Sequence, residues 1–355
     1  MAETTQKVRV AIVGYGGMGN WHARKISSLD CLELAGVYDI RQERIDFAHE
    51  KNYNTYESFE AVLADKSVEI VTVATPNHLH KELCIALMAA GKNVVCEKPV
   101  AMNSQELQEM IDASHKYGVI FTVHQNRRWD QDFLIVKKLL EENALGPVFR
   151  IESRVHGSRG IPSDWRNQKE FGGGMLLDWG VHLLDQILLM MPGKLLSVYA
   201  QLYHVTNDMV DDGFTAQLNF ENGVMVEVQT STSNFVSLPR WYVLGQNGTC
   251  IIDDFKLNGK IVMVSDWEKR DAVPVATAAG LTKTMAPRTP ETIQEYPLPE
   301  IESDVRDFYR NMIKAIRGEE EQIVKHDQVM RVMRLMEAIK ESSDTNSVID
   351  LSHLN

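Results

Sequence analysis

Val8-Arg9-Val10-Ala11-Ile12-Val13-Gly14-Tyr15-Gly16-Gly17-Met18-Gly19 is an apolar, β-branched run that turns abruptly into glycines. Three of these glycines have the spacing G-x-G-x-x-G, and a helical pattern follows from Asn20 to about Leu29. The first glycine permits a tight turn, the second lets a diphosphate approach the backbone, and the third lets the helix pack closely on the strand. Free N–H groups and the positive dipole end at the helix start favour phosphates. The segment therefore predicts a dinucleotide site.

The second strand strengthens this prediction. Residues 32–39 are apolar and end on Asp39, about 20 residues past the last glycine, where a carboxylate would bind the ribose hydroxyls of an adenosine. Such an acid would repel the extra phosphate of NADP, whereas the nearby Arg41 could accept it. We therefore expect a cofactor site here rather than an ordinary strand–turn–helix. We also expect the cofactor to be NAD rather than NADP. The residues expected to hold the cofactor here are Gly14, Tyr15, Gly16, Gly17, Met18, Gly19, Asp39, Ile40 and Arg41.

Composition limits the classes of function. A chain of 355 residues suggests two domains with ample core. The formal net charge of −12 argues against a nucleic acid or an anionic membrane as the main partner. The four cysteines lack metal-ligand spacing, so we expect no metal site and a reducing compartment. Residues 1–7 are polar and predict no export signal, and no apolar stretch is long enough to span a bilayer. Cytoplasm is the expected location.

Strands alternate with helices up to about residue 123. Strand-like runs at 68–74, 93–96 and 119–123 are separated by helical patterns at 78–90 and 104–116. This order predicts a parallel, doubly wound sheet, on which ligands bind beyond the carboxyl ends of the strands. The segments 75–78, 97–99 and 124–128 should therefore share one edge with the glycine turn.

The order of predicted strands and helices changes after about Gly146. Several strand-like runs follow with few helices between them, apart from one predicted at 175–191 and two closing helices at 303–317 and 326–342. We expect a mainly antiparallel, open sheet with a helix on one face and a partner subunit on the other, as a homodimer or homotetramer. The stretch 271–299 predicts a long loop or irregular arm. The predicted domains are a Rossmann domain, residues 1–124, and an α+β domain, residues 125–355.

Three side chains could carry chemistry. Lys98 follows the strand at 93–96 and should lie at the nicotinamide end of a bound dinucleotide, where a compact cation could polarise a substrate hydroxyl. Asp178 and His182 are four residues apart and share a helix face, and histidine is the natural acid or base near neutral pH. Taken alone, an ordinary surface pair and an exposed lysine explain these residues better.

The residues around these three side chains favour a catalytic role. The chain resembles the Gfo/Idh/MocA family, the glucose–fructose oxidoreductase-like and inositol dehydrogenase-like enzymes, through Glu97-Lys98-Pro99, Gly172-Gly173-Gly174, Asp178 and His182. The resemblance implies that Lys98 and His182 are the catalytic pair and that Asp178 positions them and the substrate. The bond at this position is often cis in enzymes of this family, so the resemblance also implies a cis bond before Pro99. The further cofactor contacts that it implies are Thr75, Pro76, Asn77, His78, Glu97, Lys98 and Asn126.

Other polar residues are candidate substrate contacts. The matching segments of relatives contribute to the pocket, which here points to Arg127, His156, Trp165 and Arg166 beside Lys98, Asp178 and His182. An arginine here can equally serve a structural ion pair. Trp179 stands where many relatives carry a smaller apolar residue, which hints at a different substrate preference.

The expected function is oxidation of a secondary hydroxyl of a sugar, glycoside or cyclic polyol to a ketone by hydride transfer. One variant is 3-oxidation of a glycoside with the bound cofactor recycled. An NAD-dependent glycosidase that uses transient oxidation and elimination is an alternative, although the tyrosine such enzymes use cannot be placed here. A non-catalytic dinucleotide sensor is a third possibility, and the presence of both Lys98 and His182 argues against it.

Overall fold

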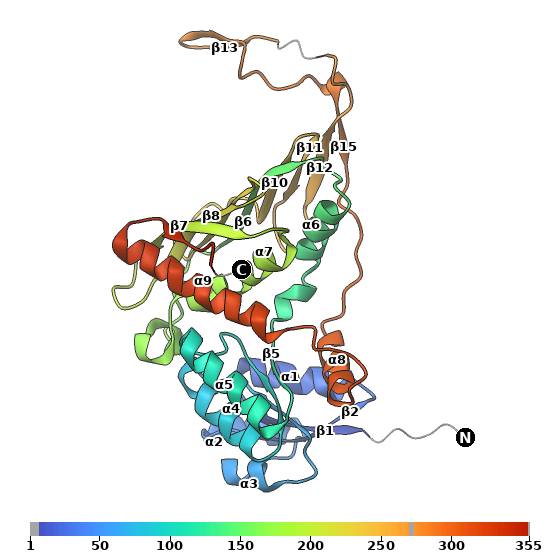
Figure 1. The fold of residues 1–355 in the computed structure, drawn as a ribbon, viewed down its shortest axis with the longest axis vertical. Coiled ribbons are helices and arrows are strands. Elements are labelled where there is room, and N and C mark those ends of the chain that lie inside the picture. Colours follow the sequence, from blue (N-terminus) through green and yellow to red (C-terminus); the bar gives the residue numbers. More distant parts are fainter. Residues whose placement is uncertain (1–6, 270–272, 354–355) are drawn as a thin grey trace, which may run out of the picture.

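A computed structural model describes residues 7–269 and 273–353. Its N-terminal half is a five-stranded parallel sheet in the order β2-β1-β3-β4-β5 (Figure 1). The strands are β1 Val8–Val13, β2 Leu32–Tyr38, β3 Ile70–Val73, β4 Asn93–Cys96 and β5 Phe121–Val123. Nearly every side chain of β1, β3, β4 and β5 is buried, as expected for a parallel sheet covered on both faces. The predicted Rossmann topology is therefore confirmed.

The connecting helices begin and end where local chemistry requires. They are α1 Gly17–Ser27, α2 Gln42–Glu50, α3 Phe59–Ala64, α4 His80–Ala89 and α5 Ser104–Tyr117. Asn103 caps α5 by accepting a hydrogen bond from the backbone N–H of Glu106 at 2.8 Å, and Gly118 ends it with φ of 64°. The predicted strands at 68–74 and 119–123 are shorter in the structure than expected.

The C-terminal half is built on a nine-stranded sheet in the order β15-β12-β11-β10-β6-β9-β8-β7-β16. Its strands are β6 Val148–His156, β7 Leu195–Tyr203, β8 Gly213–Phe220, β9 Met225–Ser231, β10 Trp241–Gly245, β11 Gly248–Ile252, β12 Gly259–Val264, β15 Ile293–Tyr296 and β16 Ile349–Asp350. All neighbours are antiparallel except β6 and β9. The predicted mainly antiparallel sheet is thus confirmed.

Alternation of buried and accessible residues gives this sheet two different faces. In β8 and β9 every second side chain is buried, and the helices α6 Gln131–Glu141, α7 Val181–Met190 and α9 His326–Thr345 lie on one side of the sheet (Figure 1). The other face presents partly accessible polar side chains such as Gln217, Glu227 and Gln229. No helix in the described part of the chain is long and apolar enough to cross a membrane.

One closing helix returns to the first sheet. The hydroxyl of Tyr309, on α8 Asp307–Ile316, lies 2.7 Å from His22 Nδ1 and 3.0 Å from Thr72 Oγ1. Tyr309 is almost fully buried, so α8 belongs to the packing of the Rossmann half although it follows the second sheet in sequence. The predicted domain boundary at 124/125 stays a prediction.

The predicted irregular segment 271–299 contains two kinds of structure. Residues 293–296 form β15 at the edge of the sheet, and β13 Val275–Thr277 pairs with β14 Gly280–Thr282 in a separate hairpin that projects from the body (Figure 1). Residues 271 and 272 of that prediction, and residues 1–6 of the polar N-terminal segment, lie outside the described residues.

Candidate active site

The glycine turn after β1 is shaped both by packing and by open space. Gly14 has φ of +92°, and a Cβ there would lie 2.6 Å from the carbonyl oxygen of Ala74. A Cβ on Gly19 would collide with the carbonyl oxygen of Gly14. By contrast, a Cβ on Gly16 would meet only Arg41 Nη2 at 4.0 Å, and one on Gly17 would meet nothing within 4 Å. The outer glycines serve the strand–helix packing, and the middle two leave the helix N-terminus open to a ligand.

Asp39 is held at this turn by backbone hydrogen bonds. Its carboxylate accepts the N–H of Tyr15 at 2.8 Å and the N–H of Arg41 at 2.9 Å, and Arg41 Nε lies 3.5 Å from it. The Tyr15 ring is fully buried, so only its backbone lies at the turn, whereas Ile40 is 84% exposed. Met18 is the second residue of α1, at the turn itself.

Lys98 and Asp178 meet across the two halves of the molecule. Lys98 Nζ donates to Asp178 Oδ1 and to the Asp178 carbonyl oxygen, both at 3.0 Å, and Arg166 Nε donates to Asp178 Oδ2 at 3.3 Å. The bond between Lys98 and Pro99 is cis, as the resemblance implied. Burial opposes ionisation of Asp178, but the Lys98 and Arg166 cations hold its pKa below the ordinary value. Asp178 is therefore a carboxylate at neutral pH.

His182 is a buried neutral imidazole close to these groups. It lies on α7, and the centres of its ring and of the Trp179 ring are 6.0 Å apart, with the ring planes at 68°. Burial, followed by the Lys98 and Arg127 cations, lowers the pKa of His182 well below its usual range. His182 can therefore accept a proton at physiological pH.

The helix that carries Asp178 and His182 differs from the prediction. Leu176–Gly180 forms a π-helical turn ahead of α7, so the pair does not have regular i,i+4 geometry. Asp211 anchors this turn, because its carboxylate accepts the N–H of Leu176 at 2.7 Å and its carbonyl accepts the N–H of Met175 at 3.0 Å. Burial raises the pKa of Asp211 to about 6. Sequence analysis missed Asp211, since no local pattern links it to residue 176.

Glu97 faces the protein interior. Its Oε1 lies 2.8 Å from both His22 Nε2 and His124 Nδ1, and its Oε2 accepts the backbone N–H of Lys98 at 3.1 Å. Despite burial, the two imidazoles hold the pKa of Glu97 well below its usual range. The ligand atoms of this trio lie within 4.8 Å of one another, but direct hydrogen bonds already join them. The trio thus supports the backbone of Lys98, and the predicted contact of Glu97 with the cofactor stays a prediction.

Several polar atoms at the strand ends are buried and have no hydrogen-bond partner among the described residues. They include Thr75 Oγ1, His78 Nδ1 and Asn126 Oδ1, and His182 Nδ1 on α7 is likewise without a partner. Buried polar atoms in proteins are nearly always paired, so such a set fits a polar ligand. Together with the open glycine turn, it suits a dinucleotide lying along the carboxyl ends of the parallel strands.

The other predicted residues have mixed surroundings. Asn77, which follows Pro76, donates to the carbonyl of Gly172 at 2.8 Å and so ties the cofactor edge to the triple-glycine loop. His156 Nε2 lies 3.1 Å from Gln229 Oε1 at the end of β6. The guanidinium carbon of Arg166 lies 4.5 Å from the centre of the Trp165 ring.

Arg127 joins an aromatic cluster that the sequence did not indicate. Its guanidinium carbon lies 4.2 Å from the Trp179 ring centre and 5.3 Å from that of Phe255, which comes from the turn between β11 and β12. Its carbonyl accepts from Gln186 Nε2 at 2.7 Å, and Gln186 Oε1 accepts from Arg240 at 2.8 Å. This network fixes Arg127 beside α7.

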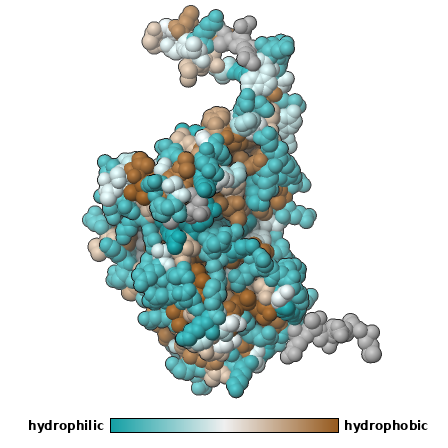
Figure 2. All heavy atoms as spheres, in the orientation of Figure 1, coloured by the Kyte–Doolittle hydropathy of each residue, from teal (hydrophilic) through white to brown (hydrophobic). Residues whose placement is uncertain are grey.

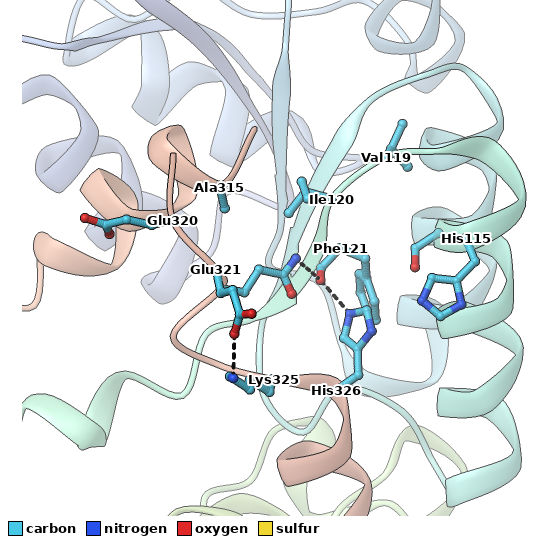
Figure 3. A pocket seen from close by; sticks show the side chains of 11 residues that line it. His115, Val119, Ile120, Phe121, Ala315, Glu320, Glu321, Lys325 and His326 are labelled. Carbon is cyan, nitrogen blue, oxygen red and sulfur yellow. Dashed lines mark hydrogen bonds and ion pairs between the residues drawn. The ribbon is translucent and has the colours of Figure 1, made fainter. Parts of the chain in front are cut away.

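A separate cavity lies at the start of β5, at the end opposite to the predicted site residues (Figure 3). His326 Nε2 and Gln322 Nε2 both bond there to the carbonyl of Phe121, at 2.8 and 3.1 Å. Phe121 begins β5, whereas the predicted site residues follow strand ends. None of them lines this cavity.

Fold and site together define a dinucleotide-dependent oxidoreductase. Residues 8–125 match the model of the oxidoreductase family with an NAD-binding Rossmann fold, and residues 133–251 match that of the GFO/IDH/MocA C-terminal domain. The chain therefore belongs to the Gfo/Idh/MocA oxidoreductase family, as its sequence indicated, and it uses a nicotinamide dinucleotide.

Solved and curated relatives cover from 52% to 98% of the chain. The structure of an NAD-binding protein from Listeria innocua superposes with a TM-score of 0.94 at 46% identity, covering 97% of this chain and 99% of that chain. The scyllo-inositol 2-dehydrogenase (NADP(+)) IolW of Bacillus subtilis is 28% identical over 98% of this chain and 96% of that protein. The D-glucoside 3-dehydrogenase of Escherichia coli is 31% identical over 52% of this chain and 54% of that protein.

Proposed function

We propose that this enzyme oxidises a secondary hydroxyl of a sugar, glycoside or cyclic polyol to a ketone. The observation that carries the proposal is the contact of Lys98 Nζ with Asp178, 3.0 Å from its Oδ1, beside the buried and neutral His182. The names of the inositol and glucoside dehydrogenases among the relatives support the same class of substrate.

The roles follow from charge and protonation state. Neutral His182 accepts the proton of the substrate hydroxyl, and the Lys98 cation stabilises the negative charge that develops on the oxygen. The C–H bond of the same carbon would break with its electron pair, and a nicotinamide dinucleotide held at the glycine turn and by Asp39 would supply the acceptor for that hydride. Asp178 holds Lys98 in place and offers a carboxylate oxygen to a neighbouring hydroxyl.

We further propose NAD as the cofactor. The carboxylate of Asp39 is directed at the glycine turn, where it would bind ribose hydroxyls and repel a phosphate. Arg41 is paired with Asp39 and is about half exposed, so it is the residue through which NADP would compete. The NADP-linked name of IolW makes a direct comparison of the two cofactors necessary.

For the substrate, a glycoside oxidised at carbon 3 with the cofactor recycled in place is the more specific proposal. We also propose a homo-oligomer that pairs the polar faces of the C-terminal sheets. The resemblance to D-glucoside 3-dehydrogenase supports the first, and the accessible outer face of β8 and β9 supports the second.

The test is a substrate screen with purified protein. Inositols, hexoses and aryl glucosides are incubated with NAD or NADP, and both NADH absorbance and the mass of the sugar are followed. The Lys98→Met variant is the matched control. NADH formation with a two-hydrogen mass loss establishes a simple dehydrogenase. Keto-sugar without NADH, accompanied by a second sugar that gains two hydrogens, establishes recycling between two sugars, and released aglycone establishes the glycosidase alternative. No change in any sugar, with dinucleotide binding intact, would overturn the proposal.

A further inference from the structure

The projecting segment of the chain exposes large apolar side chains. The arm, defined as residues 265–269 and 273–292, carries Leu281 at 76% and Met285 at 83% exposure. Figure 1 shows it leaving the body, and Figure 2 shows apolar side chains near its outer end. A two-stranded hairpin such as β13–β14 is marginally stable alone in water, and exposed apolar groups of this kind mark contact surfaces. Leu281 and Met285 are therefore available to pack on another surface.

A second exposed apolar group lies at the active-site end of the C-terminal sheet. The rim is defined by exposed Val205, Met209, Phe235, Val236 and Leu238, in the loops that follow β7 and β9. The N–H of Leu238 donates to His156 Nδ1 at 3.3 Å, which places the rim beside a candidate substrate residue. Phe235 and Val236 are 87% and 83% exposed, so residues 7–269 and 273–353 leave the rim uncovered.

Strand order separates the arm from the rim of the same chain. β11 runs toward the active-site end, where the turn before β12 carries Phe255 to Arg127. β12 then runs back and ends at Val264, whose N–H donates to the carbonyl of Asn247 in the β10–β11 turn. The arm therefore leaves the sheet at the end opposite to the rim.

We propose that the arm of one subunit covers the rim of a second copy of this chain. If two outer sheet faces pair about a two-fold axis that crosses the strands, strand directions reverse and each arm lies at its partner's active-site end. Both exposed apolar groups are then buried by one symmetric contact. This inference rests on the sheet pairing proposed above, and it assigns the arm to the mouth of the partner's substrate site.

A photo-crosslinking experiment tests the contact without any substrate. Leu281→Cys is made in a Cys31→Ser background, because Cys31 is the exposed cysteine and Cys84, Cys96 and Cys250 are buried. Benzophenone maleimide is attached, and oligomers containing unlabelled and ¹⁵N-labelled subunits are irradiated and digested. We expect mixed-isotope peptides that join the arm to residues 204–210 or 232–240. Tyr117→Cys, on α5, is the matched control and should give none.

The inference is overturned if the crosslinks stay within one subunit, reach another part of the partner, or come from a monomer. An activity measurement then addresses the site. Leu281→Asp/Met285→Asp should raise KM about tenfold, the effect of losing one or two apolar anchors from an interface. Mixing this variant with inactive Lys98→Met, whose arm is intact, should restore KM in mixed oligomers; no recovery overturns action across the interface. Crosslinks without turnover would count against the proposed function alone, and turnover without crosslinks against the arm alone.

Discussion

Replacing Gly16 by Ala separates the two roles of the glycine turn. The residue has φ of −76° and ψ of −155°, and a Cβ there would meet only Arg41 Nη2, at 4.0 Å. The backbone conformation and the space both accept alanine, so the free energy of unfolding should stay unchanged or rise by about 0.4–1 kcal/mol, since alanine restricts the unfolded chain. The added methyl group points into the open space before α1.

Dinucleotide binding should respond in the opposite way. A methyl group between the backbone and a diphosphate removes at least one hydrogen bond to a charged group, worth about 1.5–3 kcal/mol, so the Kd should rise about 10- to 100-fold. Urea unfolding of the free protein and calorimetric titration with NADH measure the two quantities. Gly19→Ala is the contrast, because its Cβ collides with the carbonyl of Gly14 and should destabilise the fold itself. An unchanged Kd for Gly16→Ala would refute a diphosphate at this turn.

Three further outcomes follow from the site. Lys98→Met or His182→Asn should lower turnover at least about 1000-fold while NADH binding, followed by fluorescence, is kept; a smaller loss contradicts their roles. Because the pKa of His182 is lowered, the acid limb of kcat/KM for oxidation should lie below pH 6.5, and Arg127→Gln should move it upward; a limb that does not move excludes this cation as a cause. Burial and the neighbouring His124 lower the pKa of His22 to about 4, so the unfolded chain binds a proton first as pH falls. Stability should therefore drop by about 3 kcal/mol between pH 6.5 and 4, and urea unfolding that is flat over this window would contradict it.

Much of the N-terminal half could be predicted because its signals are local. A buried strand, a glycine turn and a helix start lie within twelve adjacent residues, from Val8 to Gly19. Asp39 directly follows β2 and Lys98 is the second residue after β4, and parallel strands bring their carboxyl ends to one edge. Their placement therefore needed only the order of strands and helices.

Residues that act across long sequence distances could not be predicted in this way. The π-helical turn at Leu176–Gly180 is hydrogen-bonded to Asp211, and Glu97 is hydrogen-bonded to His22 and His124. Each partner is a common residue type in an unremarkable local pattern. Only the folded structure shows that the polar atoms of these distant residues meet.

The sequence by itself determined the class of fold and the dinucleotide edge, because short-range order of strands, glycines and helices specifies them, and the resemblance to a known family singled out Lys98, Asp178 and His182. Tertiary structure alone decided that Lys98 pairs with Asp178, that burial and two cations keep His182 neutral, and that the arm points away from its own rim. Protonation states and contacts of this kind depend on solvent exclusion and on charges brought together from distant segments, which appear only once the chain has folded.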